Sequence, residues 1–157
     1  MRKKGLAVQG HAAEKAVYLW YEEIKYTIGR EHYSFRAYHR YHRCDGFRAA
    51  AVLSAALDVA ACGLGALICL LAAAHLCAQT KFSICCSIMV LCFVTFACLA
   101  VSVAAIVFLY CTDMCVNEDA KRAVALRDQG FILEEGFIFI CVAAGGFFIA
   151  VFLEVFS

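Results

Sequence analysis

The sequence predicts an all-α integral membrane protein with three transmembrane helices, preceded by an amphipathic, interfacial N-terminal helical arm. Hydrophobic residues make up 64% of the 157 residues, and the mean hydropathy is +0.78. A water-soluble domain of this size cannot bury so much apolar side chain, because much of its surface must face water. The apolar residues are concentrated in three long runs, and the sequence contains no proline, which favours uninterrupted helices.

The first 48 residues form the predicted arm, and they hold ten of the fourteen lysines and arginines. No continuous apolar segment follows the basic start MRKK, so no cleaved secretory signal is expected. Apolar residues then recur at intervals of three or four, which is the spacing of one face of a helix. These residues are Ala13, Val17, Trp20, Ile24 and Ile28, and Gly29 follows them as a helix breaker.

Basic and aromatic side chains crowd residues 30–43, and on a helix they separate into two arcs. Arginines reach lipid phosphates while tyrosines lie at the level of the headgroups, so this segment is predicted to lie along a membrane surface. Acidic loops of a partner protein are the alternative target. The residues predicted to bind anionic phospholipid or a partner are Arg30, Arg36, Arg40, Arg43, Arg48, Tyr38 and Tyr41.

The same segment also has two sharper interpretations. His32, His39 and His42 are candidate metal ligands, but the neighbouring arginines repel a divalent cation and no carboxylate completes the set. Basic residues interleaved with aromatics also suit nucleic acid, but a block tethered beside a membrane makes that partner a poor fit. We therefore predict no metal, no nucleic acid, and no cofactor beyond a bound phospholipid such as cardiolipin.

Residues 49–157 are predicted to form the three-span domain, with spans at 49–78, 83–111 and 136–156. Each run is long enough, because a spanning helix needs about 20 apolar residues. Backbone groups in lipid must pair within their own segment, so these runs are predicted to be helices. The short link between the first two spans predicts an antiparallel helical hairpin.

The second link, residues 112–135, is longer and acidic. Its centre, NEDAKRAVALRDQG, predicts a short helix capped by Asn117 and ended by Gly130. With three spans, this link and the N-terminal arm lie on one side of the membrane. Together they carry thirteen basic residues against Lys81 alone in the other link, so the positive-inside rule predicts an N-terminus in the cytosol or the mitochondrial matrix.

Eleven cysteines are present, and eight of them lie within or at the edges of the apolar runs. Disulfide frameworks belong to small secreted domains, whereas a free cysteine is a small apolar residue suited to helix contacts. We therefore expect most of these thiols to be free. Cys111 and Cys115 lie one helical turn apart, which is a weak metal signal, and their redox state stays open.

Three ionisable residues interrupt the apolar runs, and such residues are costly in lipid and often functional. Asp58 is a candidate intramembrane polar contact, with a proton pathway as the alternative. His75 and Glu154 lie near the other membrane boundary. Small residues spaced four apart, Ala61 with Gly65 and Ala100 with Ala104, favour close helix contacts. The AAGG segment at 143–146 gives the third span a further stretch of small residues. Three helices need fewer small residues than this to pack against one another, so the sequence predicts partner proteins.

No nucleophile–base–acid set and no cofactor motif is found in the sequence, so we predict that the chain is not an enzyme. The function predicted first is a non-catalytic accessory subunit of a multi-subunit membrane complex. An energy-transducing complex of the mitochondrial inner membrane is favoured, with the N-terminus on the matrix side. There the arm is expected to bind cardiolipin headgroups and to stabilise assembly with the other subunits.

Two alternative functions stand beside this prediction. The Cys-rich hydrophobic spans loosely resemble those of the amastin surface proteins of trypanosomatids, which have four spans where this chain has three. The amastin signature segment is not found here, so the resemblance assigns no residue a role; it implies a free-standing polytopic surface or transport protein. The other alternative is a proton or ion pathway through Asp58.

Overall fold

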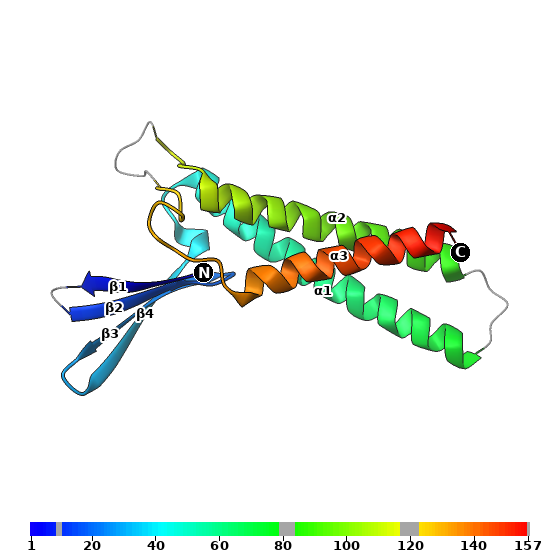
Figure 1. Cartoon of the computed structure of the whole chain (residues 1–157), viewed down its shortest axis with the longest axis horizontal. Helices are drawn as coiled ribbons and strands as arrows, with labels where there is room; N and C mark the ends of the chain where they lie inside the picture. The colour runs from blue at the N-terminus through cyan, green and yellow to red at the C-terminus, as the bar shows by residue number, and fades with distance from the viewer. Residues whose placement is uncertain (9–10, 79–83, 117–122, 157) are drawn as a thin grey trace.

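The computed structural model describes residues 1–8, 11–78, 84–116 and 123–156. Three long helices and a small β-sheet make up the described chain (Figure 1). The helices are α1 (Asp45–Ala78), α2 (Ile84–Cys111) and α3 (Glu135–Phe156).

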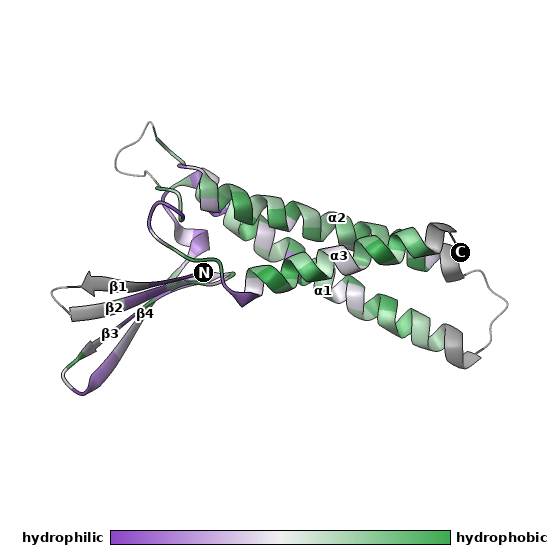
Figure 2. Cartoon of the chain, viewed as in Figure 1, coloured by the Kyte–Doolittle hydropathy of each residue, from purple (hydrophilic) through white to green (hydrophobic). Residues whose placement is uncertain are grey.

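The three predicted spans are confirmed as helices. Each contains a stretch long and apolar enough to cross a membrane, namely Asp45–Ala74, Ser87–Cys111 and Glu135–Leu153. Apolar residues run along all three helices, while the polar residues gather at the end that carries the sheet (Figure 2). The chain is therefore an integral membrane protein with its polar part on one side.

The predicted N-terminal helical arm is wrong, because the described residues before η1 form a four-stranded antiparallel sheet. Its strands follow chain order and project from the helices to one side (Figure 1). A short 3-10 helix, η1 (His39–Tyr41), then leads into α1. The strands are β1 (Arg2–Val8), β2 (His11–Val17), β3 (Tyr21–Ile28) and β4 (Glu31–Tyr38).

Pairing between side chains on neighbouring strands explains why this segment forms strands although its apolar residues are spaced as on a helix. Tyr21 lies opposite Tyr38, and Tyr26 lies opposite Tyr33 with their rings stacked at 5.5 Å. Aromatic and β-branched side chains fit a pleated surface and stabilise it through such pairs. The three-to-four spacing of apolar residues in this segment is coincidental, since those residues are divided between two strands and the loop between them.

A two-residue turn joins β3 to β4. Gly29 adopts φ +62°, a conformation that glycine tolerates and that tight hairpins require. Arg30 is the other turn residue, and both lie at the end of the hairpin farthest from the helices (Figure 1).

The link between α2 and α3 is not helical where the structure describes it. Ala123 pairs with Met114 as an isolated bridge, with N···O distances of 2.9 and 2.8 Å, and turns follow as far as Gly130. The predicted cap, Asn117, lies outside the described residues. Ile132 pairs with Arg2 of β1, so the link also joins the sheet to the start of α3.

Small side chains hold α1 against α2. Ser102 of α2 is fully buried and donates a hydrogen bond to the carbonyl of Ser54 at 3.3 Å. In lipid no hydrophobic drive joins helices, so close approach between small residues is what packs them. The buried residues on this interface include Ala51, Ser54, Ala55, Ala61, Thr95, Leu99 and Ser102.

Candidate functional site

The sheet has one polar, aromatic face that carries the candidate binding surface. Arg36 on β4 lies opposite Glu23 on β3, and the carboxylate of Glu23 accepts ion pairs from Arg36 Nε and Lys25 Nζ, both at 3.0 Å. Glu23 is only 3% exposed. Hydrogen bonds from Lys25 and Arg36 lower the pKa of Glu23, so this carboxylate stays ionised and fixes the position of the Arg36 guanidinium.

Arginines and tyrosines stack on one another along this face. Arg36 lies over the Tyr21 ring at 5.2 Å, and that ring meets Tyr38 edge-on at 5.9 Å. Arg40 lies over Tyr38 at 5.7 Å and over Tyr41 at 4.6 Å. We call these five residues the Tyr–Arg face. A guanidinium at this distance is attracted to the face of the tyrosine ring beneath it. These contacts hold the side chains in place, so they present a preorganised surface.

The structure therefore brings together four of the seven predicted binding residues, namely Arg36, Tyr38, Arg40 and Tyr41. The other three lie elsewhere. Arg30 is at the far hairpin turn, Arg43 is exposed between η1 and α1, and Arg48 lies in the first turn of α1, where its Nη2 pairs with Asp45 at 2.8 Å. The predicted separation of arginines and tyrosines into two arcs is wrong, because the segment is not an α-helix and the two residue types alternate.

The three candidate metal-binding histidines each have another partner. His32 Nδ1 lies 3.0 Å from the Thr27 hydroxyl, His39 Nε2 lies 2.9 Å from the Tyr18 carbonyl, and His42 Nδ1 accepts from the Cys44 amide at 3.2 Å. Within the described residues, no group of three or more His, Cys, Asp or Glu side chains could hold a metal ion.

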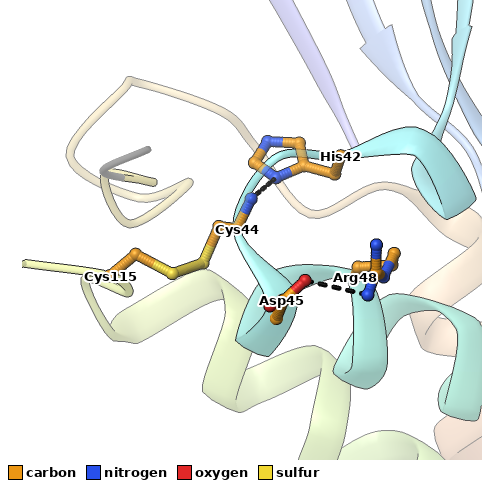
Figure 3. The surroundings of a disulfide bond; sticks show 5 residues. All are labelled: His42, Cys44, Asp45, Arg48 and Cys115. Atoms are coloured by element: carbon orange, nitrogen blue, oxygen red, sulfur yellow. Dashed lines mark hydrogen bonds and ion pairs between the residues drawn. A yellow bond between two sulfur atoms is a disulfide. The ribbon is translucent and has the colours of Figure 1, made fainter. Parts of the chain in front are cut away.

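A disulfide joins the start of α1 to the segment after α2, at the end of the helical hairpin that carries the sheet. Cys44 lies just before α1 and Cys115 just after α2; the two are 71 residues apart, with an S–S distance of 2.11 Å (Figure 3). This pair is not among the eight cysteines of the apolar runs that were expected to be free, and of those eight Cys62, Cys69, Cys98 and Cys141 are free in the structure. Of the two cysteines whose redox state the sequence left open, Cys115 is in the disulfide and Cys111 is free. The missed signal is position: both cysteines lie outside the apolar runs, at the same end of the helical hairpin.

A small core surrounds this disulfide and joins the start of α1 to the end of α2 and the link that follows it. Phe47 is buried against the disulfide, and the ring of His42 lies 4.3 Å from the Phe47 ring. Burial lowers the pKa of His42, which keeps its Nδ1 unprotonated and able to accept from the Cys44 amide. The remaining members of the core are Ala51, Leu109, Met114 and Ala123.

A second candidate site lies deeper, between the helices. A cavity of about 820 Å³ is lined by residues of all three helices and of the sheet's inner end. The two carboxylate oxygens of Asp58 are buried there, and within the described residues neither accepts a hydrogen bond of ordinary geometry. The nearby Ser102 hydroxyl donates to the Ser54 carbonyl instead. We call this cavity the Asp58 groove. A proton pathway through Asp58 stays a prediction, and the side chains of His75 and Glu154 lie outside the described part of the chain.

Comparison with protein-family models finds no matching family. Neither the curated proteins nor the solved structures yield a match.

Proposed function

We propose that this chain is a non-catalytic, free-standing membrane surface protein that displays the four-stranded sheet as a binding surface on the oxidising side of the membrane. This is one of the two alternatives that the sequence predicts. The single observation that carries it is the Cys44–Cys115 disulfide. The sheet, the disulfide core and the ends of the helices then form one extracytoplasmic head.

The disulfide supports this orientation because such bonds persist in extracellular and other oxidising compartments and are rare where thiols are kept reduced. Both cysteines lie at the end of the helices that carries the sheet (Figures 1 and 3). The proposed orientation therefore reverses the one inferred from the lysines and arginines, which assigned this end to the cytosol or the matrix.

Ion pairs within the head weaken the charge argument for the opposite orientation. Many of the basic residues counted by the positive-inside rule have acidic partners in the folded head. The rule is a statistical bias, whereas a disulfide is a covalent bond that a reducing compartment opposes. The pairs are Arg2–Glu14, Lys15–Glu22, Lys25–Glu23, Arg36–Glu23, Arg48–Asp45 and Arg127–Asp128.

The Tyr–Arg face supports a binding role for the head. Tyr38 is 48% exposed and Tyr41 is 70% exposed, so large aromatic area faces outward beside fixed arginines. Tyrosine and arginine are among the residues that contribute most to binding at protein interfaces. No sheet residue is assigned a catalytic role in this proposal.

An epitope inserted between Gly29 and Arg30 tests the proposal, because this turn is exposed at the far end of the hairpin. We expect an antibody to bind the epitope on intact cells without permeabilisation. A matched epitope at the C-terminus should bind only after permeabilisation, since three spans put the C-terminus on the opposite side. Binding at the turn only after permeabilisation contradicts the proposal.

The second candidate function is the accessory subunit of a membrane complex, and the exposed small residues of α3 favour it. Gly136, Ala143 and Gly145 are all exposed, and small residues permit close approach of another helix in lipid. If this membrane is the mitochondrial inner membrane, the orientation proposed from the disulfide corresponds to a sheet in the intermembrane space instead of the matrix. Native electrophoresis after mild detergent extraction distinguishes the two: a small homogeneous species supports the surface protein, and migration only within a large complex supports the subunit.

A further inference from the structure

We propose that the Asp58 groove is the docking site for a membrane-spanning helix of a different chain, which brings a lysine or arginine to the depth of Asp58. This inference does not depend on the function proposed for the sheet. It rests on the spacing of the residues that line the groove, on the incomplete packing of α3, and on the charge of Asp58.

The groove is lined on two sides by helix-packing seams. On α1 the lining residues Ala51, Ser54, Asp58, Ala61 and Gly65 follow one another at intervals of three or four. On α3 the lining residues Gly136, Ile140, Ala143 and Phe147 do the same. This alternation marks a seam that faces another helix, and small residues in it permit close backbone approach in lipid.

The α3 seam has little to pack against within the described chain. Both α1 and α3 pack extensively along α2, whereas α1 and α3 touch each other much less. The most apolar 18-residue window of α3 contains no buried residue, and Gly136 and Ala143 are exposed although they line the groove. Ala51, Ser54 and Ala61 of α1 are already buried, so a further helix in the groove would cover chiefly the α3 seam and Asp58.

Asp58 defines the chemistry of the occupant. It lies thirteen residues after the start of α1, which is about 20 Å along the helix and within a hydrocarbon layer about 30 Å thick. A carboxylate without a partner is costly at that depth, and a cation that pairs with it removes much of the cost. Glu134 also lines the groove, and the described lining contains no lysine or arginine.

A second copy of this chain does not bring a cation to that depth. Arg48 is the only lysine or arginine in α1, α2 or α3, and it lies in the first turn of α1, about 15 Å along the helix from Asp58, so the basic residue must come from a different chain. The lining of α1 extends from Phe47 to Gly65, which is about 27 Å of helix. That length is close to the thickness of the hydrocarbon layer and therefore fits a spanning helix.

Site-directed photo-crosslinking in the native membrane tests the proposal. A benzophenone amino acid replaces Ala143, which lines the groove, and in a control variant it replaces Val142, which is 65% exposed and does not line the groove. We expect a protein adduct of one discrete mass from position 143 and none from position 142. Peptide sequencing should place the adduct in a membrane span of another protein that contains a lysine or arginine.

Other outcomes overturn the proposal. An adduct with lipid alone, an adduct with a second copy of this chain, or equal adducts from both positions would show that no foreign helix occupies the groove. A partner span without a basic residue would contradict the role given to Asp58.

A charge exchange then tests that role directly. Asp58→Asn keeps the shape of the side chain and removes its charge, and it should reduce the adduct from position 143 by about tenfold, the ratio that corresponds to about 1.4 kcal/mol. Asp58→Lys should abolish the adduct, and replacing the partner's basic residue with aspartate should restore it. An unchanged adduct with Asp58→Asn, or no restoration by the exchange, contradicts the proposal.

Discussion

At the scale of single residues, Glu23 is the side chain on which the sheet's polar face depends. It is buried and pairs with both Lys25 and Arg36, which lower its pKa from the ordinary value of 4.5. A carboxyl group with a lowered folded-state pKa stabilises the fold above its unfolded-state pKa, and this contribution is lost as the pH falls through the folded-state pKa. The sheet should therefore lose stability below about pH 4.5.

Glu23→Gln tests this role. The variant loses both ion pairs, so we expect a lower unfolding temperature of the sheet at pH 7 and a weaker loss of stability on acidification below pH 4.5. Unfolding is followed through Trp20, the only tryptophan. Glu31→Gln, at the exposed hairpin turn, is the matched control and should have a much smaller effect. Equal effects of the two changes would contradict the account.

His42 should make the stability of the region around the disulfide depend on pH, in a range above the one in which Glu23 titrates. Burial lowers the pKa of His42 in the folded state from 6.5. As the pH falls, His42 is therefore protonated in the unfolded chain at a higher pH than in the folded chain. Stability should therefore decrease as the pH drops below 6.5 and level off below the folded-state pKa. His42→Asn keeps an acceptor for the Cys44 amide and should remove this pH dependence, whereas His32→Asn should leave it intact. A pH profile of unfolding that is unchanged in His42→Asn would show that another group titrates.

At the scale of elements, the disulfide ties the start of α1 to the segment that follows α2. Replacing Cys44 and Cys115 with serine frees a loop of 71 residues, and we expect a loss of about 2–4 kcal/mol in the free energy of unfolding of the head. Denaturant unfolding in detergent measures this loss. Replacing the free cysteines Cys62 and Cys69 with serine is the control. A similar loss in both variants would argue against a structural role for the bond.

The helices could be predicted from the sequence, but the sheet could not. The three spans were predictable because the length that a membrane requires is a local property of each apolar run. The sheet was not, because its stability comes from pairs such as Tyr26 with Tyr33 that a helical count of apolar positions does not detect. Gly29 between two segments rich in aromatic and β-branched residues was the available hairpin signal.

The candidate sites were predictable only in part, for a related reason. Asp58 was recognisable because a charge in an apolar run is conspicuous in any fold. Arg36, Arg40, Tyr38 and Tyr41 were found by their residue types, but their mutual stacking depends on strand register. The pairing of Cys44 with Cys115 depends on the fold, since connectivity among many cysteines does not follow from sequence alone.

At the scale of the whole molecule, the inner end of the sheet should touch the membrane surface. Trp20 lies in the loop between β2 and β3, is 45% exposed, and its carbonyl accepts a hydrogen bond from the His39 amide at 3.0 Å. Tryptophan favours the headgroup region. In reconstituted vesicles, lipids brominated near the headgroup should quench Trp20 more strongly than lipids brominated near the chain end. No quenching by either would indicate a head held away from the bilayer.

The most direct test of the central claim is the redox state of Cys44 in the native membrane. Membranes are denatured with an alkylating maleimide and no reductant, digested with trypsin, and analysed by mass spectrometry. We predict that the fragment Cys44–Arg48 is unmodified, bound to the fragment that contains Cys115, and alkylated only when a reductant is added first. Complete alkylation of Cys44 without reductant would contradict a head on the oxidising side of the membrane.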